Sequence, residues 1–174
     1  MRAHHMALVA AALAAVSASA LFAVDEVSHA MKQLLDSRKD DFASIRKDPH
    51  GYSGETTYMS SVLIPGAKQC YIQPESKPHY SDSCDVAESH NRAVVMAKYA
   101  EYLKDLKSVS PADWSTWTEK KTKPGGEETF IGPDHAHPAA SVRWMVEGMD
   151  ANYYLLTVTV YADGYVYPES AANR

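Results

Sequence analysis

Two histidines and an aspartate lie close together in the heptapeptide Gly-Pro-Asp-His-Ala-His-Pro, residues 132–138. Imidazole is the commonest protein ligand for zinc or copper, and a carboxylate oxygen can join such a site. On a strand, residues two apart share a face, so His135 and His137 can both reach one ion, with Asp134 as a third ligand. The same groups also suit proton transfer in a hydrolase. Asp134, His135 and His137 are therefore candidate metal ligands.

The surroundings of this segment favour a simpler interpretation. A tetrahedral zinc site needs three or four protein ligands, and the chain contains no H-E-x-x-H or C-x-x-C motif to supply the others. Prolines at both ends of the segment indicate an irregular connection. The sequence thus predicts a stiff loop, and it assigns no catalytic residue and no cofactor. A metal site remains the alternative, and it requires the fold to bring His79 or His90 to the loop.

Tyrosine is the other residue type that suggests recognition. The chain has 11 tyrosines, and several lie close together near its C-terminal end. Tyrosine is favoured on binding surfaces because it offers a large contact area and a hydroxyl group at low entropic cost. It also packs across neighbouring strands on a half-exposed sheet. Both interpretations stay open, and Tyr153, Tyr161 and Tyr165 are the candidate binding-surface residues.

The two cysteines, Cys70 and Cys84, are the only ones in the chain. In an exported protein two such cysteines form a disulfide most simply, and their spacing is far from that of a redox-active C-x-x-C motif. The bond closes a loop of about 15 residues, which stabilises the fold by roughly 3 kcal/mol in the loop-entropy model. We therefore predict a Cys70–Cys84 disulfide that holds a segment poor in core-forming side chains.

The N-terminal segment has the layout of a secretory signal peptide. Arg2 precedes an uncharged, alanine-rich stretch from Met6 to Val16, and Ala18 and Ala20 occupy the positions of an A-x-A cleavage site. We predict that residues 1–20 are cleaved and that the mature chain is secreted or periplasmic, with no stable membrane insertion. An uncleaved membrane anchor is the alternative, although alanine gains little on transfer into lipid.

The charge of the chain argues against nucleic-acid binding. Its formal net charge is -5, which becomes -6 without Arg2. Its one basic run, around Lys120 and Lys121, is short and is followed by a Pro-Gly-Gly turn. A net acidic chain of this kind lacks the basic surface that phosphate backbones require.

Hydrophobic spacing predicts two helices. Steps of three and four between apolar residues indicate a first helix over 25–46, ended by Pro49 and Gly51. Asp85 and Glu88 form a capping pattern at the start of a second helix over 86–107, whose apolar face includes Val95 and Leu106.

The remaining segments predict strands. Alternating or β-branched stretches cover 55–64, 68–73, 114–122, 127–131, 141–147 and 152–161. On the last of these, Tyr154, Leu156, Val158 and Val160 should face the core. No strand–helix–strand alternation demands a parallel sheet, so the fold class is α+β, with a single antiparallel sheet of about five to six strands and two helices packed on one face. We expect one domain over 21–168 and a flexible tail over 169–174. Along the chain, a helix followed by strands occurs twice.

These observations favour a non-enzymatic exported protein that binds an unknown protein or small ligand, or acts as an inhibitor, through its sheet. Two other hypotheses remain. One is a metal- or histidine-dependent hydrolase that uses the Asp134/His135/His137 loop, and the other is a membrane-anchored structural protein of the cell envelope that keeps residues 1–20.

Overall fold

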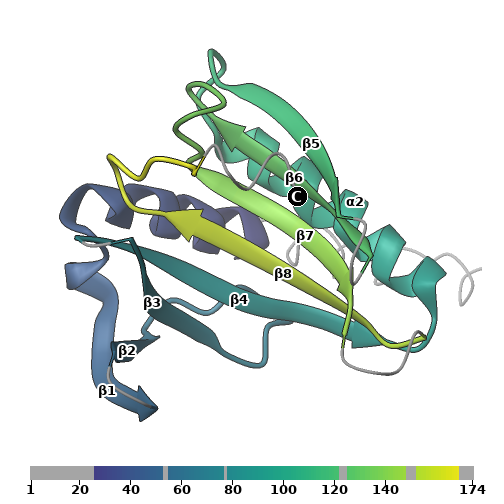
Figure 1. Ribbon diagram of the computed structural model, residues 1–174, viewed down its shortest axis with the longest axis horizontal. Coiled ribbons are helices and arrows are strands. Elements are labelled where there is room, and N and C mark those ends of the chain that lie inside the picture. The colour runs from purple at the N-terminus through teal and green to yellow at the C-terminus, as the bar shows by residue number, and fades with distance from the viewer. Residues whose placement is uncertain (1–25, 53–54, 77, 122–124, 148–151, 169–174) are drawn as a thin grey trace, which may run out of the picture.

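The described part of the chain folds into one antiparallel sheet of eight strands, with two helices on one face (Figure 1). The computed structural model describes residues 26–52, 55–76, 78–121, 125–147 and 152–168. The predicted signal peptide, the tail over 169–174 and the tip of the connection between the last two strands lie outside these residues. The α+β class is confirmed, but the expected five to six strands are too few.

Each half of the chain contributes one helix and four strands that follow it. The first helix covers residues 26–36 and leads through two short 3-10 turns, Ser37–Asp40 and Ala43–Ile45, into β1. The strands are β1 (Arg46–Tyr52), β2 (Glu55–Ser60), β3 (Cys70–Ser76) and β4 (His79–Ser89). The second half consists of α2 (Arg92–Val109), β5 (Ser115–Lys121), β6 (Gly126–Gly132), β7 (Ala140–Val146) and β8 (Tyr154–Tyr161).

The strand order is β1-β2-β3-β4-β8-β7-β6-β5, and every neighbouring pair is antiparallel. This order is symmetric about the β4–β8 pair, so the two halves have the same connectivity and meet through their last strands. The repeated helix-plus-strands order of the sequence is therefore a repeat of topology. Its consequence is that the C-terminal end of each half lies at the centre of the sheet.

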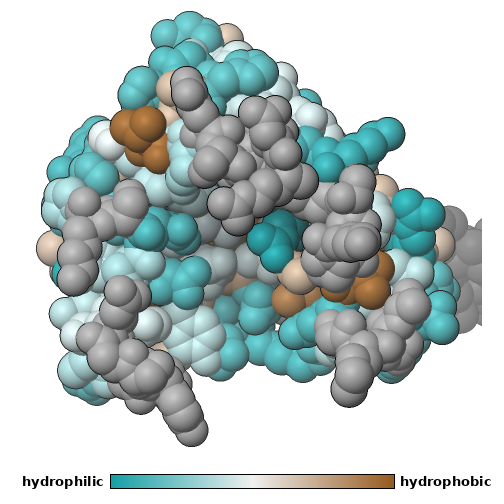
Figure 2. All heavy atoms as spheres, viewed as in Figure 1, coloured by the Kyte–Doolittle hydropathy of each residue, from teal (hydrophilic) through white to brown (hydrophobic). Residues whose placement is uncertain are grey.

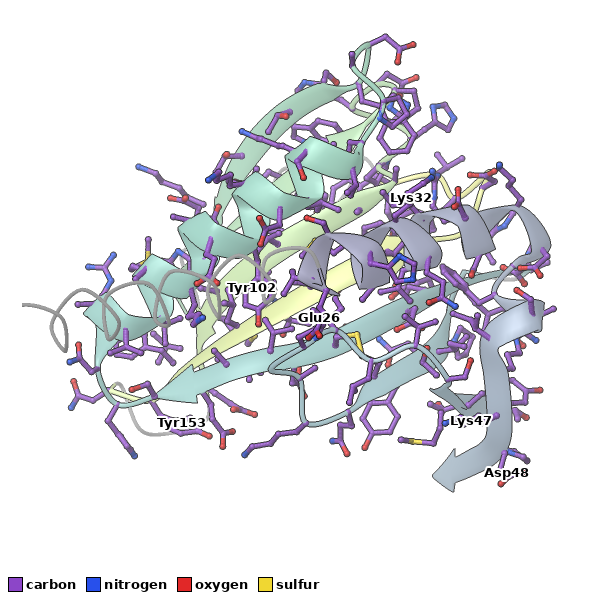
Figure 3. The ribbon with its side chains drawn as sticks, turned by 180° about the vertical axis from the view of Figure 1, so that it is seen from behind. Glu26, Lys32, Lys47, Asp48, Tyr102 and Tyr153 are labelled. Carbon is purple, nitrogen blue, oxygen red and sulfur yellow. A yellow bond between two sulfur atoms is a disulfide. The ribbon has the colours of Figure 1, made fainter. Side chains whose placement is uncertain are left out.

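The core lies between the helices and the sheet (Figure 3). Met31 and Leu34 from the first helix and Val95 and Leu106 from α2 are fully buried against it. On β8, Leu156, Val158 and Val160 are buried in this core and Tyr154 packs against it, which confirms the predicted core-facing set. The alternation of β8 therefore fixes which side of the sheet the helices cover.

The first helix is shorter than predicted. Asp41 and Phe42 both adopt left-handed backbone conformations, with φ of 57° and 63°, and these reverse the chain after the 3-10 turn. Asp41 holds this reversal, because its Oδ1 accepts a hydrogen bond from the Tyr80 backbone N–H at 3.1 Å and its Oδ2 lies 3.2 Å from Arg46 Nη2. Phe42 and Ile45, which extended the apolar spacing of the helix, are buried core residues of the turn.

The second helix starts later than predicted. Residues 86–89 belong to β4, and Asn91 caps α2 by accepting a hydrogen bond from the Ala93 backbone N–H at 3.0 Å. The capping pattern of Asp85 and Glu88 is therefore not used, since both residues pair with β8. The predicted disulfide loop is likewise a β-hairpin of β3 and β4, in which Cys70 and Cys84 lie directly opposite each other. The predicted disulfide between them is present and buried on the helix side (Figure 3).

Candidate functional site

The side of the sheet that the helices leave uncovered carries the candidate site with the most polar and charged side chains. We call it the open face. In Figure 1 the helices lie behind the sheet, so that view looks onto the open face. It contains a hollow of about 480 Å³, which falls within the range of small-molecule sites. Figure 2 shows that this side is hollowed at its centre and is largely hydrophilic or neutral.

Strand register builds the floor of the hollow. Alternate side chains of one strand share a face, and cross-strand partners lie side by side. One row crosses the sheet from β4 to β6 and is charged: Asp85, Thr157, Arg143 and Glu128 are successive partners. The neighbouring row is rich in hydroxyl groups and runs from β3 to β7: Tyr71, Ser83, Thr159 and Ser141 are successive partners. The floor thus carries polar groups held on strands, beside the apolar side chains of Met145 and Leu155.

Hydrogen bonds fix several of these polar groups. The Ser83 and Thr159 hydroxyl oxygens lie 3.1 Å apart, and Thr157 Oγ1 donates to Asp85 Oδ1 at 3.3 Å. Glu128 is nearly buried, and its Oε1 accepts from Ser141 Oγ at 2.8 Å. Because these side chains are positioned before any ligand arrives, binding would cost little ordering.

The chain after β8 forms a wall at one end of the hollow. Ala162 N–H donates to the Tyr80 carbonyl at 3.0 Å, which turns residues 162–168 back over the open face. The Tyr165 ring then stacks on the Tyr161 ring, with centroids 4.7 Å apart and planes 10° apart. Burial raises the pKa of Tyr165 to about 12, and burial also raises the pKa of Tyr161 well above its usual value. Both phenols are therefore neutral donors at physiological pH.

Arg38 anchors the start of this wall. Its Nε donates to the Tyr161 carbonyl at 2.6 Å, and its Nη2 lies 2.9 Å from Asp163 Oδ1. Desolvation lowers the pKa of Arg38, and the nearby Asp163 carboxylate partly offsets this effect. The guanidinium also lies over the Trp114 ring, 5.3 Å from its centroid. A residue of the first helical segment thus positions a wall that is supplied by the C-terminal segment.

The candidate tyrosines do not form one surface. Tyr161 and Tyr165 line the hollow together, with Tyr71 and Tyr167 from other segments. Tyr153 (Figure 3) directly precedes β8, at the end opposite to Tyr161 and about 26 Å from it along an extended strand. Its hydroxyl donates to Glu88. This hydrogen bond is the main cause that raises the pKa of Tyr153 to about 12.

The Asp134/His135/His137 loop lies next to the wall, outside the lining of the hollow. Asp134 Oδ1 accepts from the backbone N–H groups of Ala136 and His137, at 2.8 and 2.9 Å, and lies 2.9 Å from His137 Nδ1. The contact with His137 is the main cause that lowers the pKa of Asp134. Gly132 allows this loop to fold back, because a Cβ there would lie 2.6 Å from the His137 carbonyl oxygen.

The two loop histidines point to different partners. The His135 ring stacks on Trp117, with centroids 4.5 Å apart and planes 15° apart, whereas His137 pairs with Asp134. His90 lies against Tyr153 and His79 against Gly164. Within the described part of the chain, Asp134, His135 and His137 do not bring three ligand atoms within reach of one metal ion. The cluster with that geometry consists of Cys70, Asp82 and Cys84, and its two sulfurs are bonded to each other.

The charged row was not predicted as a site. Arg143 and Ser141 alternate with the buried Val142 and Trp144, so the sequence does show that β7 has a polar side. What the sequence does not show is that β8 lies between β4 and β7, which brings Asp85 into one row with Arg143.

Comparison with protein-family models, with curated proteins and with solved structures gives no match. Among the described helices, none is long and apolar enough to cross a membrane.

Proposed function

We propose that this protein is exported and acts as a non-enzymatic binding protein, and that its ligand occupies the hollow on the open face of the sheet. One observation carries the proposal: the hollow of about 480 Å³ is lined by polar side chains from five strands and by an aromatic wall. Strands and their cross-strand hydrogen bonds give such a site fixed geometry. The predicted signal peptide and the disulfide support export, because structural disulfides persist in oxidising compartments.

A blocked variant tests this proposal. Thr157 lies in the floor of the hollow, and Thr157→Trp would fill part of it. Lys104→Trp adds the same side chain at an exposed position of α2, so it serves as the matched control. The disulfide-bonded mature protein and both variants are screened by ligand-observed NMR against sugars, amino acids, nucleotides and amines.

The proposal predicts at least one compound class that binds the native protein and the Lys104→Trp control but loses binding with Thr157→Trp. Binding that Thr157→Trp leaves intact would place the ligand elsewhere. If no class binds at millimolar concentration, the hollow is not a small-molecule site.

The hydrolase hypothesis has a narrower basis in the Asp134–His137 pair, which resembles the orienting part of a catalytic dyad. It predicts stoichiometric metal or hydrolytic activity that a His135→Ala/His137→Ala double variant removes. Elemental analysis and an activity screen of the two proteins decide it, and unchanged behaviour of the double variant ends the hypothesis. If residues 1–20 are retained as an envelope anchor, the intact mass of the exported protein includes them. If they are cleaved, the measured mass is that of a chain that begins at Leu21.

A further inference from the structure

The electrostatic character of the hollow indicates which ligand class it suits. Among the described residues, its lining contains three carboxylates, Glu75, Asp85 and Glu128, and one guanidinium, Arg143. Arg143 and Glu128 are direct cross-strand partners on β7 and β6, and opposite charges in such positions compensate each other. The negative charge that remains belongs to Glu75 and Asp85. A cationic ligand complements this lining, and an anionic one does not.

The two carboxylates are spaced along one side of the hollow. Glu75 Oε1 accepts from Ser81 Oγ at 2.7 Å, and Asp85 lies four residues further along β4 than Ser81. Four residues of extended strand span about 13 Å. Since a carboxylate offers about four acceptor positions, each retains capacity for an ammonium group beside its hydroxyl donor. The spacing suits a ligand with two positive ends and a linear connection between them.

The surface between the carboxylates matches such a connection. Ser83 and Thr159 present hydroxyl oxygens midway, which can accept hydrogen bonds from an internal amine. The Tyr71 ring beside Ser83 offers an apolar surface for methylene groups and an aromatic face for a cation. Arg143 lies on the far side of Thr157, so repulsion directs a cation away from β7 and along β4.

We propose that the hollow binds a linear aliphatic polyamine, with one terminal ammonium group at Glu75 and the other at Asp85. This inference rests on the proposed function, because it identifies the ligand class of the same site. It predicts attraction that weakens as ionic strength rises, since the paired groups are partly exposed. A neutral sugar would use the same hydroxyl and tyrosine groups without that dependence on salt.

Isothermal titration of the disulfide-bonded mature protein with spermidine tests the inference, since its extended length is of the same order as the separation of the carboxylates. Glu75→Gln and Asp85→Asn keep the side-chain shape and the hydroxyl contact but remove the charge. Each should weaken spermidine binding about tenfold or more, because charge-assisted hydrogen bonds are lost. Glu101→Gln, on the exposed side of α2, should change the affinity less than about twofold by the same reasoning.

Ligand length and Arg143 provide two independent checks. Putrescine is too short to reach both carboxylates, so it should bind more weakly than spermidine and should lose less affinity in either single variant. Arg143→Gln removes the repulsive charge and should strengthen spermidine binding. Far-UV circular dichroism of each variant confirms that it is folded before titration.

Several outcomes would overturn the inference. Spermidine binding that neither Glu75→Gln nor Asp85→Asn weakens would place the amine elsewhere. No spermidine binding, together with another class that Thr157→Trp blocks, would refute the polyamine but leave the hollow as a ligand site. Tighter binding of a peptide with two lysines than of spermidine would assign the site to basic peptides instead.

Discussion

Asp82 makes a quantitative test of the core possible. Its carboxyl group lies on the helix side of β4, fully buried beside the disulfide, and its Oδ2 has no hydrogen-bond partner among the residues that the structure describes. A hydrogen bond from the Ser60 hydroxyl favours the ionised form, but desolvation outweighs it and raises the pKa of Asp82 from 3.8 to about 7. The folded protein therefore holds this proton in a range of pH where the unfolded chain has lost it.

The sign and size of the effect follow from this difference. Between about pH 4 and about pH 7 the folded state binds one more proton than the unfolded state, so stability falls as pH rises and then levels off. One pH unit corresponds to about 1.4 kcal/mol. The difference between 3.8 and about 7 thus makes the fold about 4 kcal/mol less stable above pH 7 than below pH 4, as far as Asp82 is concerned.

Asp82→Asn removes this dependence, because the amide stays neutral at every pH. The variant keeps an oxygen that can accept from Ser60, but its new N–H groups need partners. Its free energy of unfolding therefore differs from that of the native protein by an amount that does not depend on pH. Urea unfolding at about pH 4, 6 and 8 should show the native protein losing about 4 kcal/mol more than the variant across the range. Asp113→Asn, at an exposed position, is the matched control and should follow the native protein.

Equal slopes for the native protein and Asp82→Asn would refute this reasoning. That result would mean that Asp82 is already ionised in the folded protein at about pH 4, and hence that water or a cation reaches its carboxylate.

Three further variants test other parts of the structure. Replacing both Cys70 and Cys84 by alanine should lower the free energy of unfolding by about 3 kcal/mol, measured by urea unfolding at fixed pH, because the unfolded chain gains freedom in a loop of about 15 residues; a loss well under 1 kcal/mol would contradict the entropic account. Arg38→Met removes the hydrogen bonds to Tyr161 and Asp163, so it should lower the free energy of unfolding by about 2 kcal/mol or more and speed proteolysis of the C-terminal segment. The control Lys39→Met, at the exposed neighbouring position, should leave both unchanged. Equal effects of the two substitutions would show that Arg38 does not anchor the wall. Gly132→Ala places a Cβ against the His137 carbonyl, so it should lower the free energy of unfolding by about 2 kcal/mol. The loop should shift, and the fluorescence of Trp117, on which His135 stacks, should change with it. An unchanged emission spectrum would show that the loop accommodates the methyl group.

The sequence predicted the parts of the fold in which one side of a strand is clearly hydrophobic. On β8 the alternation of Leu156, Val158 and Val160 identified the core side correctly. On β4 two of the buried positions on the helix side are Asp82 and Cys84, so a carboxyl group and a disulfide hide the same alternation. A chance capping pattern at Asp85 then predicted a helix from residue 86, whereas α2 starts six residues after that position, at Arg92.

The edge strand β1 was missed for a related reason. Pro49 and Gly51 interrupt its pattern and are typical of turns, but proline is tolerated on an edge strand because one side makes no ladder hydrogen bonds. The missing β1 and β4 account for the difference between six predicted strands and the observed eight.

The candidate site depended on information that one sequence does not contain. The loop histidines and the C-terminal tyrosines were found by residue type. The fold places the loop beside the segment after β8, since the Tyr167 backbone N–H donates to the Ala136 carbonyl at 2.8 Å, but it leaves Tyr153 at the other end of the strand. The charged row required the pairing of β8 between β4 and β7. This pairing joins residues far apart in the chain, and no local pattern encodes it.

Methyl NMR of the disulfide-bonded protein during a spermidine titration tests most directly whether the open face is the binding site. Thr157, Thr159, Leu155 and Met145 carry methyl groups that line the hollow, while the exposed Leu63 and Val94 lie outside it. Binding in the hollow predicts saturable shifts for the first group and none for Leu63 and Val94. Unchanged lining methyls at saturating spermidine, or equal shifts at Leu63 and Val94, would contradict it.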